Sequence, residues 1–171
     1  AVVCRSSTSG CDPAETCTGS DSACPGNVIN GTTNTCATAT AMTPLSLAGT
    51  STSSVANTLA GPAGSSLWYV IQFPQNPTIN NNGRGTPALS LTSADPSLRF
   101  DVNYGACGTA GTCTSGIPTG LTTWSFTDNA STAGVNQYIS RNRLWPAFVY
   151  VRVYRPSAAT MCGSFTLNAS R

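Results

Sequence analysis

The feature that most constrains the fold is the segment from Ala147 to Arg155, the longest uninterrupted run of β-branched and aromatic residues in the chain. Side chains of a strand alternate between the two faces of a sheet, so Val149, Val151 and Val153 are expected on one face. The other face then carries Phe148, Tyr150, Arg152 and Tyr154. A strand that is apolar on one side and aromatic on the other indicates a central position in a protein with two layers of sheet.

From Cys36 onward the chain has an all-β pattern, because apolar runs recur between Gly, Pro, Asn and Ser clusters and no long stretch has a helical period. Strands are expected around residues 45–47, 67–73, 89–91, 98–104, 122–127, 138–139, 147–154 and 165–167. About eight strands predict an antiparallel β-sandwich of the jelly-roll type, with a closed barrel as the alternative. The polar segment 75–86 is expected to be a surface loop.

The chain has 8 cysteines and no histidine. The even count predicts four disulfides and an oxidising compartment. A zinc site made of four cysteines is the alternative, but the sequence has no Cys-x2-Cys pair. Cysteines are dense between residues 4 and 24, where apolar residues are almost absent, so covalent links are expected to hold this segment. We therefore expect a cysteine-rich arm with its linker over residues 1–35 and a sandwich domain over residues 36–171.

The arm carries the pattern Cys-Arg-x5-Cys-Asp-x2-Glu-x-Cys-x-Gly-x4-Cys-Pro. This pattern resembles the adhesive-loop half of disintegrin domains, and also disintegrin-type repeats of large secreted bacterial proteins. The resemblance implies a disulfide between Cys4 and Cys24, which leaves Cys11 and Cys17 for each other or for a partner elsewhere. The integrin-recognition loop of the family would correspond to residues 5–12, which lack an Arg-Gly-Asp tripeptide. We therefore expect a structural cap or linker rather than a receptor-binding loop.

The second domain contains four short motifs in this order: Cys36–Ala39, Trp68-Tyr69, Tyr150–Val153 and Gly163–Leu167. Their order resembles that of the bacterial pre-peptidase C-terminal domain, a β-sandwich appended to secreted proteases and surface proteins. Some members of that family hold calcium through clustered acids. Here the acids of the second domain are scattered, so we predict no metal site and no cofactor. These acids are Asp95, Asp101 and Asp128.

The remaining cysteines agree with a sandwich. Cys107 and Cys113 are expected to close one short loop, and Cys36 and Cys162 to join the first strand to the last. Closing so long a loop would stabilise the fold by about 4 to 5 kcal/mol in the chain-entropy model.

Charge is scarce, at 8% of residues with a net charge of +2, so the surface must consist mainly of Ser, Thr, Asn, Gln and Gly. Such a surface suits a secreted, glycosylated or self-associating protein, and the dispersed arginines argue against nucleic acid as a partner. No apolar run is long enough to span a membrane and no signal peptide precedes Ala1, so we expect a mature or excised secreted segment. Sequons begin at Asn30, Asn129 and Asn168, although 13 Asn and 46 Ser plus Thr would give roughly 3.5 sequons by chance.

Without His or Lys, a Ser-His-Asp triad, a Cys-His pair and a Schiff base are excluded. No acid has an apolar sequence context that would raise its pKa for glycosidase chemistry, so we predict no enzyme and no catalytic residue. A sugar-stacking platform would form if several of five aromatic residues share an exposed face, namely Trp68, Trp124, Trp145, Tyr150 and Tyr154. Of these, a binding role is expected for Trp145, Tyr150 and Tyr154.

Two functions follow from these observations. We expect a secreted structural or adhesive surface protein, assembled into a filament or array in which the arm contacts a neighbouring copy. The alternative is a carbohydrate-binding accessory module of a secreted hydrolase. The expected partners are accordingly other copies of the chain or glycans of the cell surface and matrix.

Overall fold

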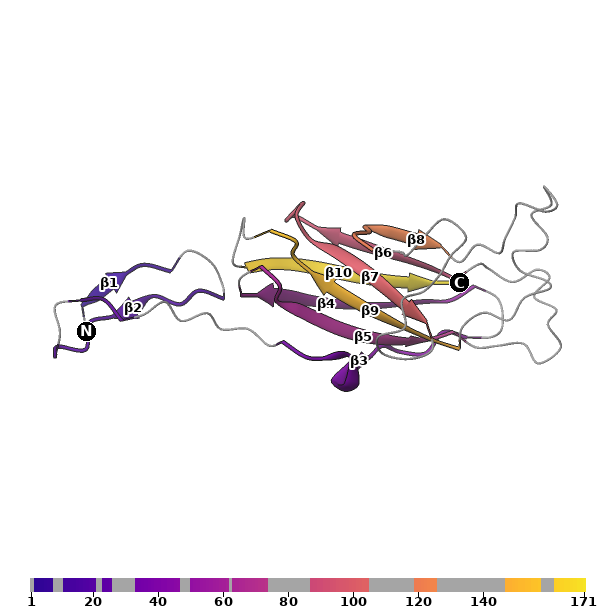
Figure 1. The fold of residues 1–171 in the computed structure, drawn as a ribbon, viewed down its shortest axis with the longest axis horizontal. Coiled ribbons are helices and arrows are strands. Elements are labelled where there is room, and N and C mark those ends of the chain that lie inside the picture. The colour runs from indigo at the N-terminus through magenta and orange to yellow at the C-terminus, as the bar shows by residue number, and fades with distance from the viewer. Residues whose placement is uncertain are drawn as a thin grey trace.

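The computed structural model describes residues 2–7, 11–20, 23–25, 33–46, 50–61, 63–73, 87–104, 119–125, 147–157 and 162–171. The described part is all-β, which confirms the predicted fold class. It has a two-stranded sheet in the arm and two four-stranded sheets that form the sandwich. The arm lies beyond one end of the sandwich (Figure 1).

The elements of the described ranges follow one another along the chain, with one short 3-10 helix, η1, before the first strand of the sandwich. They are β1 (Val3–Arg5), β2 (Glu15–Thr16), η1 (Cys36–Thr38), β3 (Thr40–Ala41), β4 (Thr52–Ala60), β5 (Ser66–Gln72), β6 (Ala88–Ser93), β7 (Arg99–Tyr104), β8 (Thr123–Ser125), β9 (Phe148–Tyr154) and β10 (Cys162–Ser170).

One sheet of the sandwich has the order β4-β10-β6-β8 and the other has the order β3-β5-β9-β7. Neighbouring strands are antiparallel, except that β3 runs parallel to β5. The two sheets meet along one edge, where Phe100 of β7 pairs with Leu121 just before β8. This is a single bridge, so the described strands form a sandwich rather than the closed barrel that was the alternative.

Strand β9 occupies the central position that its sequence predicted. It pairs with β5 on one side and with β7 on the other. Val149, Val151 and Val153 have no exposed surface and point into the core. Burying a side chain of this size contributes about 1.5–3 kcal/mol.

The core fills the space between the two sheets. Tyr69 of β5 and Phe165 of β10 meet across it edge to face, with ring centroids 6.2 Å apart. Such a pair adds about 0.5–1.5 kcal/mol beyond the area that it buries. The Tyr69 hydroxyl is not left without a partner, because it accepts a hydrogen bond of 3.1 Å from the Asn57 amide. Burial raises the pKa of Tyr69, and this hydrogen bond lowers it in part.

The sequence did not predict β1 and β2 of the arm or β3 and β4 of the sandwich, and it misplaced another strand. Strand β4 was not predicted, because alternation is weak in its run Thr-Ser-Ser-Val-Ala-Asn-Thr-Leu-Ala. The side that faces the core has only two apolar residues, Val55 and Leu59. The strand expected around Leu45 is wrong. Leu45 is buried, but it lies outside any strand. Its backbone N–H donates one hydrogen bond to the Gln72 carbonyl oxygen. The weak strand expected at 138–139 and the loop 75–86 lie outside the described residues.

Candidate functional site

The outward sides of β5, β9 and β7 form a surface of ring and arginine side chains, which we call the aromatic face. Its residues are Ser66, Trp68, Val70, Gln72, Arg99, Asp101, Asn103, Phe148, Tyr150, Arg152 and Tyr154. Tyr150 and Tyr154, both predicted as binding residues, lie here and are half-buried. Phe148 is 44% exposed. The sheet therefore gathers several aromatic side chains on one outer face.

Arg152 lies at the centre of the aromatic face. It is directly opposite Trp68 on β5 and Asp101 on β7. Its guanidinium is 4.7 Å from the ring centroid of Tyr154 and 4.0 Å from the Asp101 carboxylate. A planar guanidinium stacked on a ring and paired with an acid is held in one orientation. The centre of this face is therefore ordered and locally neutral.

Tyr154 is linked to the same group. Burial raises its pKa above the usual value, and the nearby Asp101 carboxylate, to which the hydroxyl donates a hydrogen bond, raises it further. The Gly120 backbone N–H donates to Asp101 as well, at 2.8 Å. Asp101 thus ties together β7, β9 and the segment that leads to β8.

The opposite sheet presents a different outer surface, which we call the hydroxyl face. Its residues are Thr52, Ser54, Ala56, Thr58, Ala88, Ser90, Thr92, Thr123, Ser125, Ser164, Thr166, Asn168 and Ser170. None of these side chains is charged or larger than asparagine. A shallow hollow of about 520 Å³ lies over β4, β10 and β6 on this face, between residues such as Thr58, Thr92 and Thr166.

The arm is folded around a cluster of charges. The Arg5 guanidinium donates to Asp12 at 2.6 Å and to both carboxylate oxygens of Glu15. Asp12 and Glu15 are only 1% and 6% exposed, so Arg5 supplies the positive charge that their burial requires. The two carboxylates, Glu15 first, raise the pKa of Arg5. The charged residues of the disintegrin-like pattern thus bind one another within the arm.

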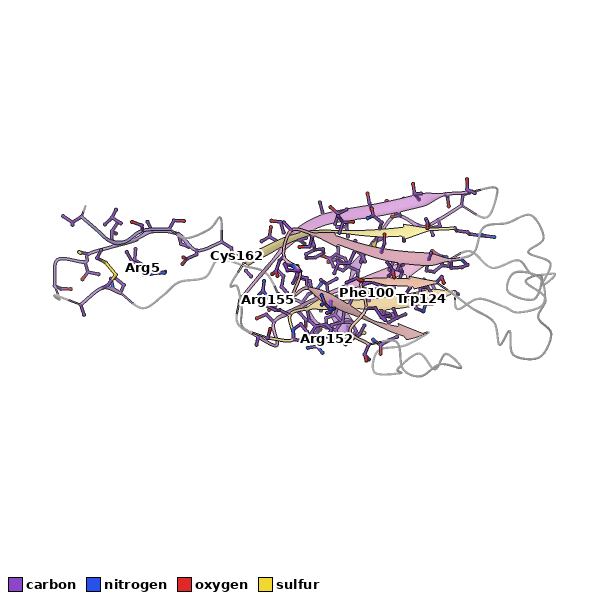
Figure 2. The ribbon with its side chains drawn as sticks, turned by 90° about the horizontal axis from the view of Figure 1, so that it is seen from above. Arg5, Phe100, Trp124, Arg152, Arg155 and Cys162 are labelled. Atoms are coloured by element: carbon purple, nitrogen blue, oxygen red, sulfur yellow. A yellow bond between two sulfur atoms is a disulfide. The ribbon has the colours of Figure 1, made fainter. Side chains whose placement is uncertain are left out.

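A covalent bond ties the arm to the sandwich. Cys11 forms a disulfide with Cys162, the first residue of β10, with Cα atoms 5.9 Å apart. Next to it, the fully buried Arg155 pairs with Asp95 at 3.1 Å and donates to the Gly61 carbonyl oxygen. Figure 2 shows Cys162 and Arg155 at the end of the sandwich nearest the arm.

The glycine beside the tether has no room for a side chain. A Cβ atom on Gly163 would lie 2.7 Å from the Asp95 carboxylate and 2.9 Å from the Arg155 guanidinium. Contacts this short would require the Asp95 or Arg155 side chain to shift. Position 163, next to the tether, is therefore suited to glycine.

The cysteine pairing differs from the sequence prediction in two respects. Cys4 and Cys24 are bonded, as the resemblance implied, with Cα atoms 5.7 Å apart. The expected bond between Cys36 and Cys162 is wrong, because Cys162 faces the arm and bonds to Cys11. Cys36 is itself disulfide-bonded. Cys17, which was expected in a disulfide, is an exposed free thiol, since Cys11 is already taken. Cys107 and Cys113 lie outside the described residues.

The other predicted site residues fall into two groups. Trp145, Asn30 and Asn129 lie outside the described residues, and their roles stay predictions. Asn168 lies on the outward side of β10, half-buried between Ser54 and Ser90, so a glycan on it would cover the hydroxyl face.

Every aspartate and glutamate in the described part has an arginine partner. Asp12 and Glu15 pair with Arg5, Asp95 with Arg155, and Asp101 with Arg152. The described residues hold no cluster of three or more acids, cysteines or histidines that would bind a metal ion. No helix in the described ranges has the length and hydrophobicity to cross a bilayer.

Sequence reasoning missed two members of the candidate surfaces. Val2 and Val3 of the arm were not singled out, although they are 73% and 52% exposed, and nothing in the sequence marks them. Of the two further tryptophans considered for the stacking platform, Trp68 is half-exposed on the aromatic face, although its strand was expected to be buried. Trp124 is buried in the core and does not belong to that face.

The fold and these surfaces define a two-layer β-sandwich with a disulfide-bonded arm. No protein-family model, curated protein or solved structure matches the chain.

Proposed function

We propose that this protein is a non-enzymatic structural or adhesive surface protein whose arm contacts a neighbouring copy. The observation that carries the proposal is the arm itself. It is cross-linked internally by Cys4–Cys24, tied to the sandwich by Cys11–Cys162, and lies beyond one end of the sandwich. A projecting element that is held this firmly suits a contact with another molecule.

The surface chemistry of the arm supports the same role. Val3, in strand β1, and Val2, the residue before it, are exposed. The charged side chains beside them pair with one another in the Arg5 cluster. Exposed apolar side chains on the free part of an arm favour burial against a partner. Because donor and acceptor surfaces would differ, the contact would be head-to-tail and would propagate if its rotation does not close.

A non-enzymatic role is supported by the pairing of acids with arginines. A carboxyl group serves as a general acid or base when its environment raises its pKa toward neutrality. Each described aspartate and glutamate is instead engaged in an ion pair with an arginine.

The test is the mass of the intact chain in solution, measured by light scattering from micromolar to millimolar concentration. We expect the mean mass to rise with concentration above the 17.5 kDa of one copy, and filaments or arrays to appear in electron micrographs. Replacing Val2 and Val3 with threonine should return the mass toward that of one copy. A single species of 17.5 kDa across the whole range would overturn the proposal.

A further inference from the structure

We infer that the arm of one copy docks on a defined part of the aromatic face of the next copy, at the end of the face furthest from the tether. This inference rests on the proposed function, because it names the acceptor surface for the arm. The acceptor, which we call the remote patch, consists of Val70 and Gln72 of β5 and Phe148 and Tyr150 of β9.

The first argument is the inventory of exposed apolar side chains. Among the described residues, the large hydrophobic side chains that are exposed are Val2, Val3 and Phe148. Two of them lie on the arm and the third lies in the remote patch. The exposed apolar surface is thus divided between two places, which is the arrangement that a donor and an acceptor require.

The second argument is that these places lie at opposite ends of one molecule. The end of β9 at Tyr154 leads directly to Arg155, which contacts the start of β10 beside the Cys162 tether. Phe148 is at the other end of β9, six residues away, which is about 20 Å along a strand. The arm extends from the tether away from the sandwich (Figure 1), so it points away from its own remote patch.

The third argument is the composition of the remote patch. Tyr150 and Val70 lie opposite each other on β9 and β5, with Phe148 and Gln72 as the next pair. Aromatic residues are enriched at the centres of protein interfaces, where charged residues are depleted. The patch has two rings, one valine and one amide, and no charged residue.

Charge favours the same pairing over the wider surfaces. The described arm has one arginine against two carboxylates, Asp12 and Glu15, and so is net negative. The aromatic face has Arg99 and Arg152 against Asp101, and so is net positive. The hydroxyl face offers neither rings nor charge, and it therefore provides no comparable acceptor.

The test uses the intact chain with substitutions on the exposed surface. Phe148→Thr with Tyr150→Thr should reduce the concentration-dependent rise in mass as strongly as Val2→Thr with Val3→Thr does, with at least a tenfold loss in association constant. Thr92→Val with Thr166→Val, which adds apolar surface to the hydroxyl face, should leave association unchanged. Circular dichroism and thermal melting of each variant establish that the sandwich remains folded.

Photo-crosslinking identifies the contact directly. A benzophenone amino acid at position 148 should yield a crosslinked peptide from the arm of another copy, detected by mass spectrometry after mixing isotopically light and heavy chains. Crosslinks to the arm of the same copy, or to a site other than the arm, would overturn the inference. If the chain assembles but the Phe148 and Tyr150 variant assembles equally well, the remote patch is not the acceptor while the proposed function stands.

The rival occupant of the remote patch is a glycan. Retardation of the chain in gels containing soluble polysaccharides, abolished by the Phe148 and Tyr150 variant while association is unaffected, would assign the patch to sugar binding and would overturn the inference.

Discussion

The two outer faces of the sandwich are built on sheets of the same size, yet they have opposite surface chemistry. The hydroxyl face carries serine, threonine, alanine and asparagine, whereas the aromatic face carries Trp68, Phe148, Tyr150 and Tyr154 around an Arg152–Asp101 pair. The hydroxyl face demonstrates that this fold can present a full sheet to water without aromatic side chains. The rings on the other face are therefore not a requirement of the fold, and they agree with the proposed contact with a neighbouring copy.

The comparison of the two outer faces assumes that inner positions contribute more to stability than outer positions do. The strongest expected effect concerns the buried ion pair between Arg155, which follows β9, and Asp95, which follows β6. Asp95→Ala leaves the guanidinium buried without its carboxylate, and we expect a loss of about 3–5 kcal/mol in the free energy of unfolding, measured by urea denaturation. Thr166→Ala, on the outward side of β10, should cost less than about 0.5 kcal/mol. Equal losses in the two variants would mean that inner and outer positions do not differ as the structure has them.

A direct comparison of the faces uses matched outward positions. Trp68→Thr removes a ring that lies opposite Arg152, and we expect a loss of about 1 kcal/mol in the free energy of unfolding. Thr92→Ala on the hydroxyl face should have a smaller effect, within about 0.5 kcal/mol. A larger loss at Thr92 than at Trp68 would contradict the view that the Trp68 ring contributes more to stability than a hydroxyl group on the other face.

The faces should also differ in their response to alkaline pH. Burial and Asp101 raise the pKa of Tyr154, so the folded state holds this proton more tightly than the unfolded state does. The stability that results is fully present below the unfolded pKa of about 10, and it is lost as the pH rises through the folded value. Tyr154→Phe should therefore flatten part of the alkaline decline in melting temperature. The core residue Tyr69 contributes a decline of the same sign, which this variant leaves intact.

For the pH prediction, the matched control is Ser164→Ala, because the hydroxyl face has no titratable side chain among its described residues. This variant should leave the alkaline profile unchanged. An alkaline decline that is identical in wild type and Tyr154→Phe would show that Tyr154 is not the group responsible.

The smallest expected effect on stability concerns the arm. Cys17 is an exposed free thiol whose backbone N–H bonds to the Val2 carbonyl oxygen, so a probe on Cys17 would report on the apolar end of the arm. Cys17→Ser should change the free energy of unfolding by less than about 0.5 kcal/mol. In the folded, unreduced chain, peptide mapping should locate maleimide on Cys17 and find Cys4, Cys11, Cys24 and Cys162 unmodified. Modification of Cys11 or Cys162 would break the assignment of the tether.

The sequence predicted the fold class and the two sides of β9, because both depend on local alternation of side chains. Val149, Val151 and Val153 are buried and Tyr150 faces outward, as the pattern required. Strand β4 escaped prediction for the same physical reason. Its outward residues are small, being serine, threonine and alanine, and its inward residues include Ser53, so the contrast on which alternation depends is weak.

The candidate site was predicted only in part. Tyr150 and Tyr154 were correctly placed on one face, but the neighbours that complete it come from β5 and β7, far away in the sequence. The exposure of Val2 and Val3 was not predicted, because it depends on which residues pack against the arm. The sequence contains no signal for that packing.

What the sequence determined by itself is a chain of alternating strands with a cysteine-rich arm and almost no charge, since periodicity and composition are properties of the chain alone. Only the tertiary structure decided that Cys162 bonds to Cys11 rather than to Cys36, over a separation of 151 residues. It also decided which face of each sheet meets water. Both outcomes depend on how strands from distant parts of the chain come together, because a disulfide or a surface requires atoms to be adjacent in space, whatever their distance along the chain.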